Sequence, residues 1–291
     1  MISAMLKLLI KPLSKLSLPT LHCLGNVLGL LLFRLMPASR KRIQAHLLQS
    51  QLVKDNANLT KVIKSNMQEN AKALLESFAL WQKSNEEVLS WVKECRGWST
   101  VEAALAKNKG IIFLTPHLGC FEICSVYYGQ YHPVTVLFRP PKQTWLGPII
   151  DAGRSKGHVK LAPANLNGVR SLMQALKKGE AIGILPDQIP ASGEGEWADF
   201  FGKPAYTMTL ASKLANKTGA AIIMAFGERL ENGEGYIVHF NQLPDDAIAT
   251  PALLNLQIEK QVAQKPIQYL WQYPRYKVRR HSVKQDANSA E

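Results

Sequence analysis

The sequence GIIFLTPHLGCFE at residues 110–122 decides how the rest of the chain is arranged. Its apolar run Ile111–Leu114 predicts a short buried strand. The run breaks at Pro116, and it is followed by His117 and Glu122. In α/β folds, the loop between a strand and the next helix is where chemistry tends to be placed. This corner is therefore the first candidate for a functional site.

From residue 99 onward, apolar runs alternate with helical patterns. The runs that predict strands are residues 111–114, 134–138, 158–161, 181–185, 220–226 and 236–240. The helical patterns lie near residues 118–128, 143–155, 167–178, 206–218 and 251–264. Such alternation implies βαβ units, and it predicts an α/β fold with a mostly parallel central sheet flanked by helices. A loop-rich insertion at residues 186–204 interrupts it, and the length of this insertion suggests a functional loop or lid.

Composition divides the chain into three segments. Residues 1–40 are apolar and basic, and they are expected to associate with a membrane. Residues 41–280 are expected to form a single α/β domain. Its first part, residues 41–97, is predicted to be helical, because residues 47–91 contain no Pro or Gly. Residues 281–291 are expected to form a disordered tail.

The charge balance is strongly basic. The chain has 291 residues with 35 Lys and Arg against 22 Asp and Glu, a net charge of +13 and a pI near 9.6. Such an excess favours anionic partners, whether nucleic acid, acidic proteins or anionic lipid surfaces. The four cysteines form no C-x-x-C pair, which favours reduced, packed thiols in a cytosol-facing protein over a disulfide or a metal site.

An uncharged run between Lys15 and Arg34 is about the minimum length for spanning a bilayer. Pro19, Gly25 and Gly29 weaken it, and basic residues flank it on both sides. No small-residue cleavage site follows, so a removable signal peptide is not expected. A helix or hairpin lying on an anionic membrane fits this pattern better than a clean span.

The spacing of His117 and Glu122 limits what they can do together. Side chains five positions apart on an ideal helix point about 140° away from each other, so a metal-binding pair on one helix face is excluded. The two can cooperate only if His117 lies in the loop or first turn and the chain bends back, which Pro116 and Gly119 permit.

A neutral imidazole oriented by a carboxylate is a general base. No G-x-S-x-G elbow and no other obvious nucleophile accompanies this pair, so the nucleophile is expected to be a hydroxyl of the substrate. The alternative is a histidine that only caps a helix or packs in the core.

Residues 115–122 resemble the H-x4-D/E block of the lysophospholipid-acyltransferase superfamily, and more narrowly the bacterial lipid A late acyltransferases. Further blocks similar to that family follow in the same order, at residues 136–140, 168–179, 184–188, 200–207 and 214–221. The resemblance covers nearly the whole chain. It implies a glycerol-3-phosphate-acyltransferase-like fold.

The resemblance also implies an activity. Such an enzyme is a membrane-associated O-acyltransferase at the cytoplasmic face of the inner membrane. It would move a fatty acyl chain from acyl carrier protein to a hydroxyl of a lipid A precursor. His117 would be the general base and Glu122 would orient it, with direct attack on the thioester and with no acyl-enzyme, metal or cofactor.

Four more residues fall at positions that the resemblance assigns to substrate binding: Arg139, Asp187, Gln188 and Thr207. Arg139 would bind an anionic group or stabilise an oxyanion. A surface arginine, a turn aspartate and a helix-capping threonine are the alternatives for Arg139, Asp187 and Thr207.

Other side chains near these blocks have two interpretations each. Arg154 and Lys156 are expected to be solvated charges rather than site residues. Candidates to line an acyl tunnel, or simply to pack in the core, are Trp145, Trp197, Phe200 and Phe201.

The basic charge would suit an acidic acyl carrier protein and an anionic membrane. Two other functions stay open. The acceptor can be a different lipid or glycolipid, or the chain can be a non-catalytic basic protein that binds a membrane. Nucleic acid is not an expected partner, because the sequence has no recognisable nucleic-acid module.

Overall fold

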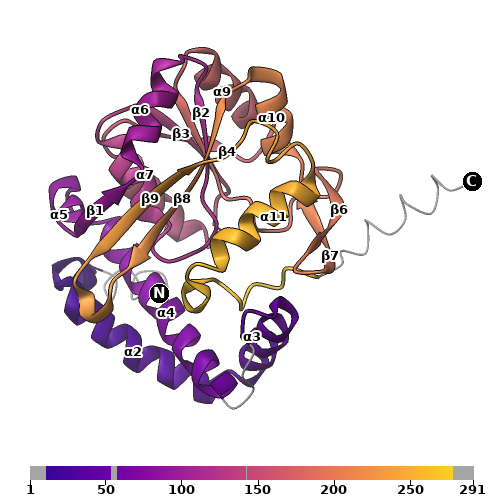
Figure 1. Ribbon diagram of the computed structural model, residues 1–291. Helices are drawn as coiled ribbons and strands as arrows, with labels where there is room; N and C mark the ends of the chain where they lie inside the picture. Colours follow the sequence, from indigo (N-terminus) through magenta and orange to yellow (C-terminus); the bar gives the residue numbers. More distant parts are fainter. Residues whose placement is uncertain (1–10, 54–57, 142, 278–291) are drawn as a thin grey trace, which may run out of the picture.

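A seven-stranded sheet runs through the molecule in the order β1-β9-β8-β2-β5-β3-β4 (Figure 1). The computed structural model describes residues 11–53, 58–141 and 143–277. The strands are β1 (Val92–Arg96), β2 (Ile111–Leu114), β3 (Val134–Phe138), β4 (Val159–Pro163), β5 (Ala181–Ile184), β8 (Ala221–Arg229) and β9 (Tyr236–Gln242). Neighbouring strands are parallel except β8 and β9. The predicted α/β fold with a mostly parallel sheet is confirmed.

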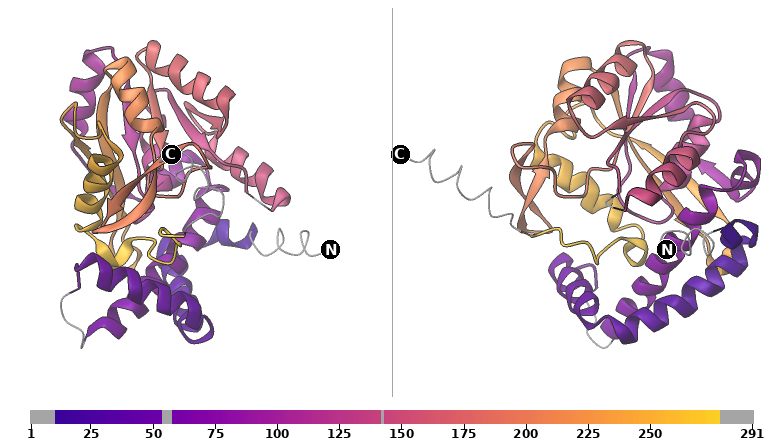
Figure 2. Two further views of the ribbon diagram at one scale, coloured as in Figure 1. Left: turned by 90° about the vertical axis from the view of Figure 1, so that its right-hand side faces the viewer. Right: turned by 180° about the vertical axis from the view of Figure 1, so that it is seen from behind.

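Helices cover both faces of the sheet (Figure 2). The α-helices are α2 (Leu18–Leu35), α3 (Pro37–Ser50), α4 (Leu59–Leu80), α5 (Asn85–Leu89), α6 (Trp98–Ala106), α7 (Glu122–Gly129), α8 (Gly147–Arg154), α9 (Leu166–Lys177), α10 (Leu210–Thr218) and α11 (Pro251–Val262). Helices α6 and α7 pack on one face, and α9, α10 and α11 pack on the other. Short 3-10 turns lie at Lys11–Lys15, Thr144–Leu146, Glu231–Gly233 and Pro266–Gln268.

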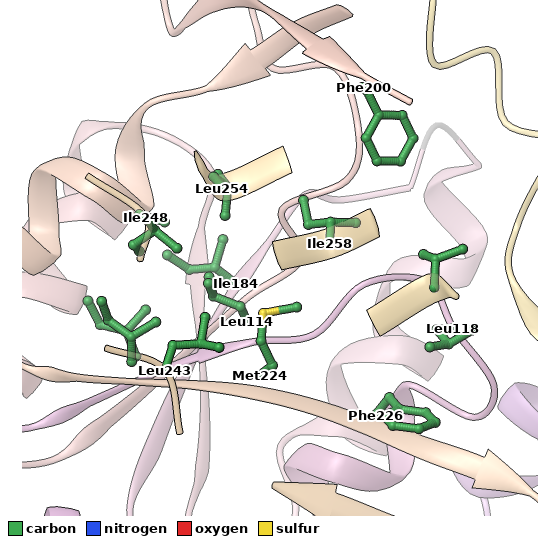
Figure 3. Packing of buried hydrophobic residues seen from close by; sticks show 14 of the residues in the cluster. Leu114, Leu118, Ile184, Phe200, Met224, Phe226, Leu243, Ile248, Leu254 and Ile258 are labelled. Atoms are coloured by element: carbon green, nitrogen blue, oxygen red, sulfur yellow. The ribbon is translucent and has the colours of Figure 1, made fainter. Parts of the chain in front are cut away.

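Strand β2 is covered by helices on both faces of the sheet, which explains why its sequence is apolar without interruption. All four of its residues are buried: Ile111 and Phe113 face α6 and α7, while Ile112 and Leu114 face the other helical layer. A strand covered on both faces has no polar side, so its sequence does not alternate. Figure 3 shows Leu114 in the second of these layers, packed among side chains of β5, β8 and α11.

Three strands were not predicted. Strand β1 falls in the segment expected to be helical, and β6 (Gly195–Phe200) pairs with β7 (Lys203–Met208) as a hairpin in the region expected to be a loop. The helix expected from residue 206 therefore begins only at Leu210. These strands are short, and their hydrogen bonds come from partners that local periodicity does not show: β9 pairs with β1, and the β6–β7 hairpin stands apart from the main sheet.

Helix α2, the first α-helix of the described chain, packs against α4. A Cβ on Gly25 would approach the backbone of Lys72 to 2.8 Å, and one on Gly29 would approach Cα of Gln68 to 2.3 Å, so the two backbones need glycine to come this close. Helix α2 is long and apolar enough to cross a membrane by length and composition.

The predicted domain limits at residues 40 and 280 stay predictions, and the predicted tail at 281–291 lies outside the described residues.

A buried cluster of charged side chains joins helices α2 and α4 to strand β8 of the sheet. Glu76 on α4 accepts hydrogen bonds from Arg229 on β8 at 2.6 and 2.7 Å, and it contacts His22 of α2 at 2.5 Å. Arg229 also donates to Glu69 at 2.7 Å. Burial would raise the pKa of Glu76, but Arg229 and His22 lower it to about 2. The carboxylate therefore stays charged in the interior because it is paired.

Candidate active site

His117 and Asp187 meet where two neighbouring strands end. Strands β2 and β5 run parallel and pair residue for residue, so the loops that follow them leave the same edge of the sheet. The His117 backbone N–H donates to Asp187 Oδ2 at 2.9 Å, and His117 Nδ1 lies 2.8 Å from Asp187 Oδ1. The two carboxylate oxygens of Asp187 therefore bind the backbone and the ring of His117, and together they fix the orientation of the imidazole.

The second ring nitrogen of His117 faces Gln188. The Gln188 side-chain amide lies 3.1 Å from His117 Nε2. Because the Asp187 carboxylate only accepts hydrogen bonds, Nδ1 carries the proton in the neutral ring and Nε2 carries the lone pair. The Gln188 amide donates to that lone pair. This is the tautomer that a general base at Nε2 requires.

The surroundings of Asp187 keep it charged. Burial would raise the pKa of Asp187, but the charge of His117 and two hydrogen bonds from that residue lower the pKa below its ordinary value. Tyr269, from the C-terminal segment, is also buried here, and burial and the nearby Asp187 raise its pKa well above the ordinary range. The site therefore has one ionised carboxylate and a phenol that keeps its proton.

The loop that carries His117 is shaped by Gly119. This residue has φ +60°, and a Cβ there would lie 2.1 Å from the carbonyl oxygen of Gly227. Its N–H donates to the carbonyl of Gln268 at 3.1 Å. His117 lies in the loop rather than in the helix, which begins only at Glu122, so the condition set for cooperation is met, but the bend at Gly119 leaves His117 with Asp187 and not with Glu122.

Glu122 has a different partner from the one expected. Its carboxylate accepts from Arg154 Nε at 2.9 and 3.1 Å, and from Nη2 as well. Among the described residues no hydrogen bond or ion pair joins Glu122 to His117. The carboxylate on His117 belongs instead to Asp187, because the pairing of β2 with β5 brings the two loops together.

Arg154 is therefore a paired and largely covered side chain rather than a solvated charge. It is the last residue of α8, and its guanidinium lies 5.7 Å from the ring centre of Trp81 and 5.4 Å from that of Phe138. Burial would lower the pKa of Arg154, but Glu122 raises it. The second residue expected to be solvated, Lys156, donates to the carbonyls of Leu80 and Lys83.

The two remaining predicted residues lie in contrasting environments. Arg139 follows β3 and is exposed, and within the described part of the chain it has no hydrogen-bond or ion-pair partner. Thr207 is fully buried in β7, where its hydroxyl accepts from Asn255 at 2.9 Å and from Arg275 at 2.8 Å. Its position in a strand excludes the helix cap, and the contacts join the hairpin to α11 and the C-terminal segment.

Two pockets lie near His117 and share the side chain of Phe121. The first, here called the open groove, has about 820 Å³ of space free of protein atoms, and His117 lines it together with residues of α2, α4 and the C-terminal segment. The second, here called the inner pocket, lies between α7, α8 and the sheet, and its volume of about 610 Å³, like that of the groove, includes space open to solvent. Phe121 lines both, and its ring centre lies 4.8 Å from that of His117.

The four aromatic residues proposed for an acyl tunnel line neither pocket. Phe200 and Phe201 pack against each other, and Phe201 packs against Trp271. Trp197 packs against Tyr206 within the β6–β7 hairpin. For Phe200 and Phe201, the core interpretation is the one that the structure supports.

All four cysteines are unpaired, with Cys120 and Cys124 buried and Cys23 exposed. Burial raises the pKa of Cys120 and Cys124, so both thiols stay protonated. Within residues 11–53, 58–141 and 143–277, no group of three or more His, Cys, Asp or Glu side chains is placed to hold a metal ion.

Sequence reasoning missed two partnerships, between Asp187 and His117 and between Arg154 and Glu122. A usable signal existed for the first, because both residues directly follow short buried strands. Had those strands been placed side by side in a parallel sheet, the two side chains would have been predicted to meet. For Arg154 only the helix end was visible, and a basic residue at a helix end is ordinary.

Comparisons with known proteins agree with this geometry. A family model described as bacterial lipid A biosynthesis acyltransferase matches residues 4–278. The lipid A biosynthesis lauroyltransferase of Escherichia coli (strain K12) is 26% identical over 275 residues, which cover 91% of this chain and 88% of that protein. The lipid A biosynthesis palmitoleoyltransferase of the same organism is 26% identical over 224 residues, 75% of this chain and 72% of that protein. Because the family model covers nearly the whole chain, this protein belongs to the bacterial lipid A biosynthesis acyltransferases, as the sequence motifs indicated.

Proposed function

We propose that this enzyme transfers a fatty acyl chain from acyl carrier protein to a hydroxyl of a lipid A precursor. The observation that carries the proposal is His117, whose Nδ1 is held by a buried carboxylate and whose side chain lines a largely apolar groove. The names of the two Escherichia coli relatives support the acyl chain and the lipid acceptor.

The proposed reaction is direct. His117 Nε2 takes the proton from the acceptor hydroxyl as its oxygen attacks the thioester carbonyl. The tetrahedral intermediate collapses with cleavage of the carbon–sulfur bond, and the imidazolium returns the proton to the leaving thiolate. The products are an ester and a free thiol. Asp187 stabilises the imidazolium between these two steps, which is the role first expected of Glu122.

Glu122 and Arg154 act as a support in this proposal. Their ion pair joins Glu122, the first residue of α7, to Arg154, the last residue of α8. Glu122 directly follows Phe121 in the sequence. Phe121 in turn contacts the His117 ring. A pair in this position holds the wall of the site at a fixed distance from the base, and small displacements of a base are costly.

Arg139 is assigned to the donor. It is exposed, without a partner in the described part of the chain, and it leaves the edge of the sheet at which His117 and Asp187 lie, because β3 is parallel to β5. An unpaired guanidinium is a good ligand for phosphate groups. Acyl carrier protein is acidic, so the same charge would also attract the donor.

Membrane association has a defined surface in this proposal, here called the outer face of α2. It consists of Leu24, Val27, Leu31 and Leu35, which are between 43% and 67% exposed. They lie opposite the face that packs on α4, at positions that fall on one side of a helix. One face of α2 packs on α4 and the other exposes these leucines and valine, so in this proposal α2 lies along the membrane surface with its outer face in the lipid.

Charge and shape support a lipid surface there. The first 54 residues contain no Asp or Glu, and Arg34 of α2 and Lys41 and Arg42 of α3 are exposed. Leu32 of α2 and the half-exposed Leu74 of α4 line the open groove that leads to His117. A lipid acceptor could therefore reach the base from the cytoplasmic leaflet of the inner membrane without leaving it.

The activity is tested by following a labelled acyl chain from acyl carrier protein into lipid. Purified enzyme is incubated with acyl carrier protein bearing labelled laurate and with a lipid A precursor, and the product is identified by mass spectrometry. Transfer by the wild type and its loss in His117→Ala support the proposal. Unchanged transfer in His117→Ala contradicts the mechanism, and label on a different lipid contradicts the acceptor.

The membrane surface is tested by flotation with vesicles that contain phosphatidylglycerol. The double variant Val27→Glu, Leu31→Glu should float at least 10-fold less than the wild type. The matched control is Leu166→Glu on α9, where the leucine is 78% exposed and lies away from this face. Equal flotation of the double variant and the wild type would contradict the assignment.

A further inference from the structure

The inner pocket exists because one side chain is missing from a row across the sheet. Phe113 of β2, Gly183 of β5 and Val136 of β3 are in register, and all three line the pocket. Gly183 lies between two large side chains and has none of its own. A Cβ there would come within 3.2 Å of a Val136 methyl group, so even alanine would fill part of the space.

The remaining walls of this pocket suit a hydrocarbon chain. Apolar side chains come from α7 and from strands β3, β4 and β9, including Val134, Val159 and Phe240. The two charged residues among its walls, Glu122 and Arg154, neutralise each other in a bidentate ion pair. A chain of methylene groups would therefore meet no unpaired charge, and burying it would be favourable.

Phe121 separates this pocket from the open groove. It is the residue directly before α7, it lines both spaces, and its ring lies against His117. The open groove continues to α2 and α4, whereas the inner pocket lies under α7 and α8. The open groove thus reaches His117 directly, and the inner pocket lies on the other side of Phe121, which contacts His117.

We propose that the inner pocket holds the acyl chain of the donor, and that Gly183 and Tyr128 set the chain length accepted there. This proposal rests on the proposed acyl transfer. In it, the thioester lies at His117, the acyl chain passes Phe121 into the inner pocket, and the open groove is left to the lipid acceptor. The assignment separates the two hydrophobic substrates, so neither competes for the other's site.

The dimensions suggest which residues limit the chain. From Phe121 to Tyr128 the pocket follows seven residues of α7, about 10 Å of helix. Tyr128 is 1% exposed and packs against Phe113 with ring centres 4.7 Å apart, which closes the far end. Its hydroxyl is buried, and in the described part of the chain it has no hydrogen-bond partner. A smaller side chain at Tyr128 would deepen the pocket, and a larger one at Gly183 would narrow it.

The test is a competition between acyl carrier proteins that carry acyl chains of different lengths, with products counted by mass spectrometry. For Gly183→Ala, we expect the ratio of long-chain to short-chain product to fall about 10-fold, since small changes of pocket volume change selectivity by such factors. The matched control is Gly147→Ala, because a Cβ at Gly147 meets nothing within 4 Å. Its product ratio should equal that of the wild type.

Tyr128→Leu gives the opposite test, with a shift towards longer chains. If Gly183→Ala and Tyr128→Leu transfer acyl chains with wild-type selectivity, the inner pocket does not hold the donor chain and this inference is overturned. If the wild type transfers no acyl chain at all, the proposed function itself has failed. If Tyr128→Leu does not fold, Gly183→Ala alone decides, because its added methyl group needs only a small movement of Val136.

Discussion

Three histidines in the described part of the chain contact a carboxylate, namely His22, His117 and His239, and the first two differ most clearly in their access to a groove. His117 Nδ1 lies 2.8 Å from Asp187, and His22 Nε2 lies 2.5 Å from Glu76. The side chain of His117 is 15% exposed and lines the open groove, whereas His22 and Glu76 are 2% and 0% exposed. The same chemical pair therefore serves two purposes, and access to the second ring nitrogen separates them.

The two carboxylates also differ in how many charged side chains they pair with. Glu76 is shared between His22 and Arg229, so its negative charge is committed to an interior ion pair that fastens α2 and α4 to β8. Asp187 accepts hydrogen bonds from the imidazole and the backbone N–H of His117, and in the described residues no Arg or Lys forms an ion pair with it. A base needs a carboxylate whose charge can respond to the imidazolium, which Asp187 provides and Glu76 does not.

The largest expected effect distinguishes the two histidines by activity. His117→Ala should lower the rate of acyl transfer about 10³-fold or more, because a general base contributes 10²–10⁴-fold. Its free energy of unfolding should fall less than that of Glu76→Gln, because Asp187 keeps the hydrogen bond from the backbone N–H of residue 117. Steady-state transfer and urea unfolding of the same preparation measure both quantities. A large loss of stability with little loss of rate would reverse the assignment.

Glu76→Gln should affect stability instead. It leaves the buried Arg229 without its main counter-ion, and removing one partner of a buried pair costs about 3–5 kcal/mol. The matched control is Glu94→Gln, which breaks an exposed pair with Arg96 and should leave stability almost unchanged. Urea unfolding gives both values. Equal stability of the two variants would show that the interior cluster does not hold α2 and α4 in place.

The pH dependence of stability should report the same carboxylate. The folded protein lowers the pKa of Glu76 from its ordinary value near 4.5 to about 2. Because the pKa is lower in the folded state, the contribution is complete above about pH 4.5 and is lost as the pH falls towards 2. It should amount to at most about 3 kcal/mol. The difference in unfolding free energy between wild type and Glu76→Gln should therefore shrink from pH 5 to pH 2.5, and a constant difference would contradict the pairing.

The smallest expected effect concerns Gln188. Its amide touches His117 Nε2, the position that the acceptor hydroxyl must occupy. Gln188→Ala should change kcat/KM by about 10-fold or less, because one neutral hydrogen bond contributes about 1 kcal/mol. Kinetics at several acceptor concentrations measure the effect. A loss as large as that of His117→Ala would mean that Gln188, and not the groove, positions the reactants.

Much of the fold followed from local sequence. The bounds of β2 and β3 were predicted to the residue, because each is a short apolar run with a clear break at its end. Helix α11 begins as expected, with Thr250 accepting from Leu253 at 3.2 Å. Strand β1 and the β6–β7 hairpin were missed, since their identity depends on partners rather than on their own periodicity.

The site was predicted in its parts but not in its pairing. The loop position of His117 followed from Pro116 and Gly119, yet its carboxylate was expected to be Glu122, the nearest in sequence. The partner is 70 residues away, and only the order of strands in the sheet brings it to the histidine. Spacing along a chain identifies candidates, whereas strand order decides which of them meet.

The most direct measurement of the central claim is the rate of acyl transfer by Asp187→Asn. This change keeps the shape of the side chain, but it removes the charge that stabilises the imidazolium and it disturbs the tautomer of His117. The account predicts a fall in kcat of about 10²–10⁴-fold, with little change in the KM for the acceptor. A variant that transfers acyl chains at the wild-type rate would show that Asp187 does not serve His117 in the reaction.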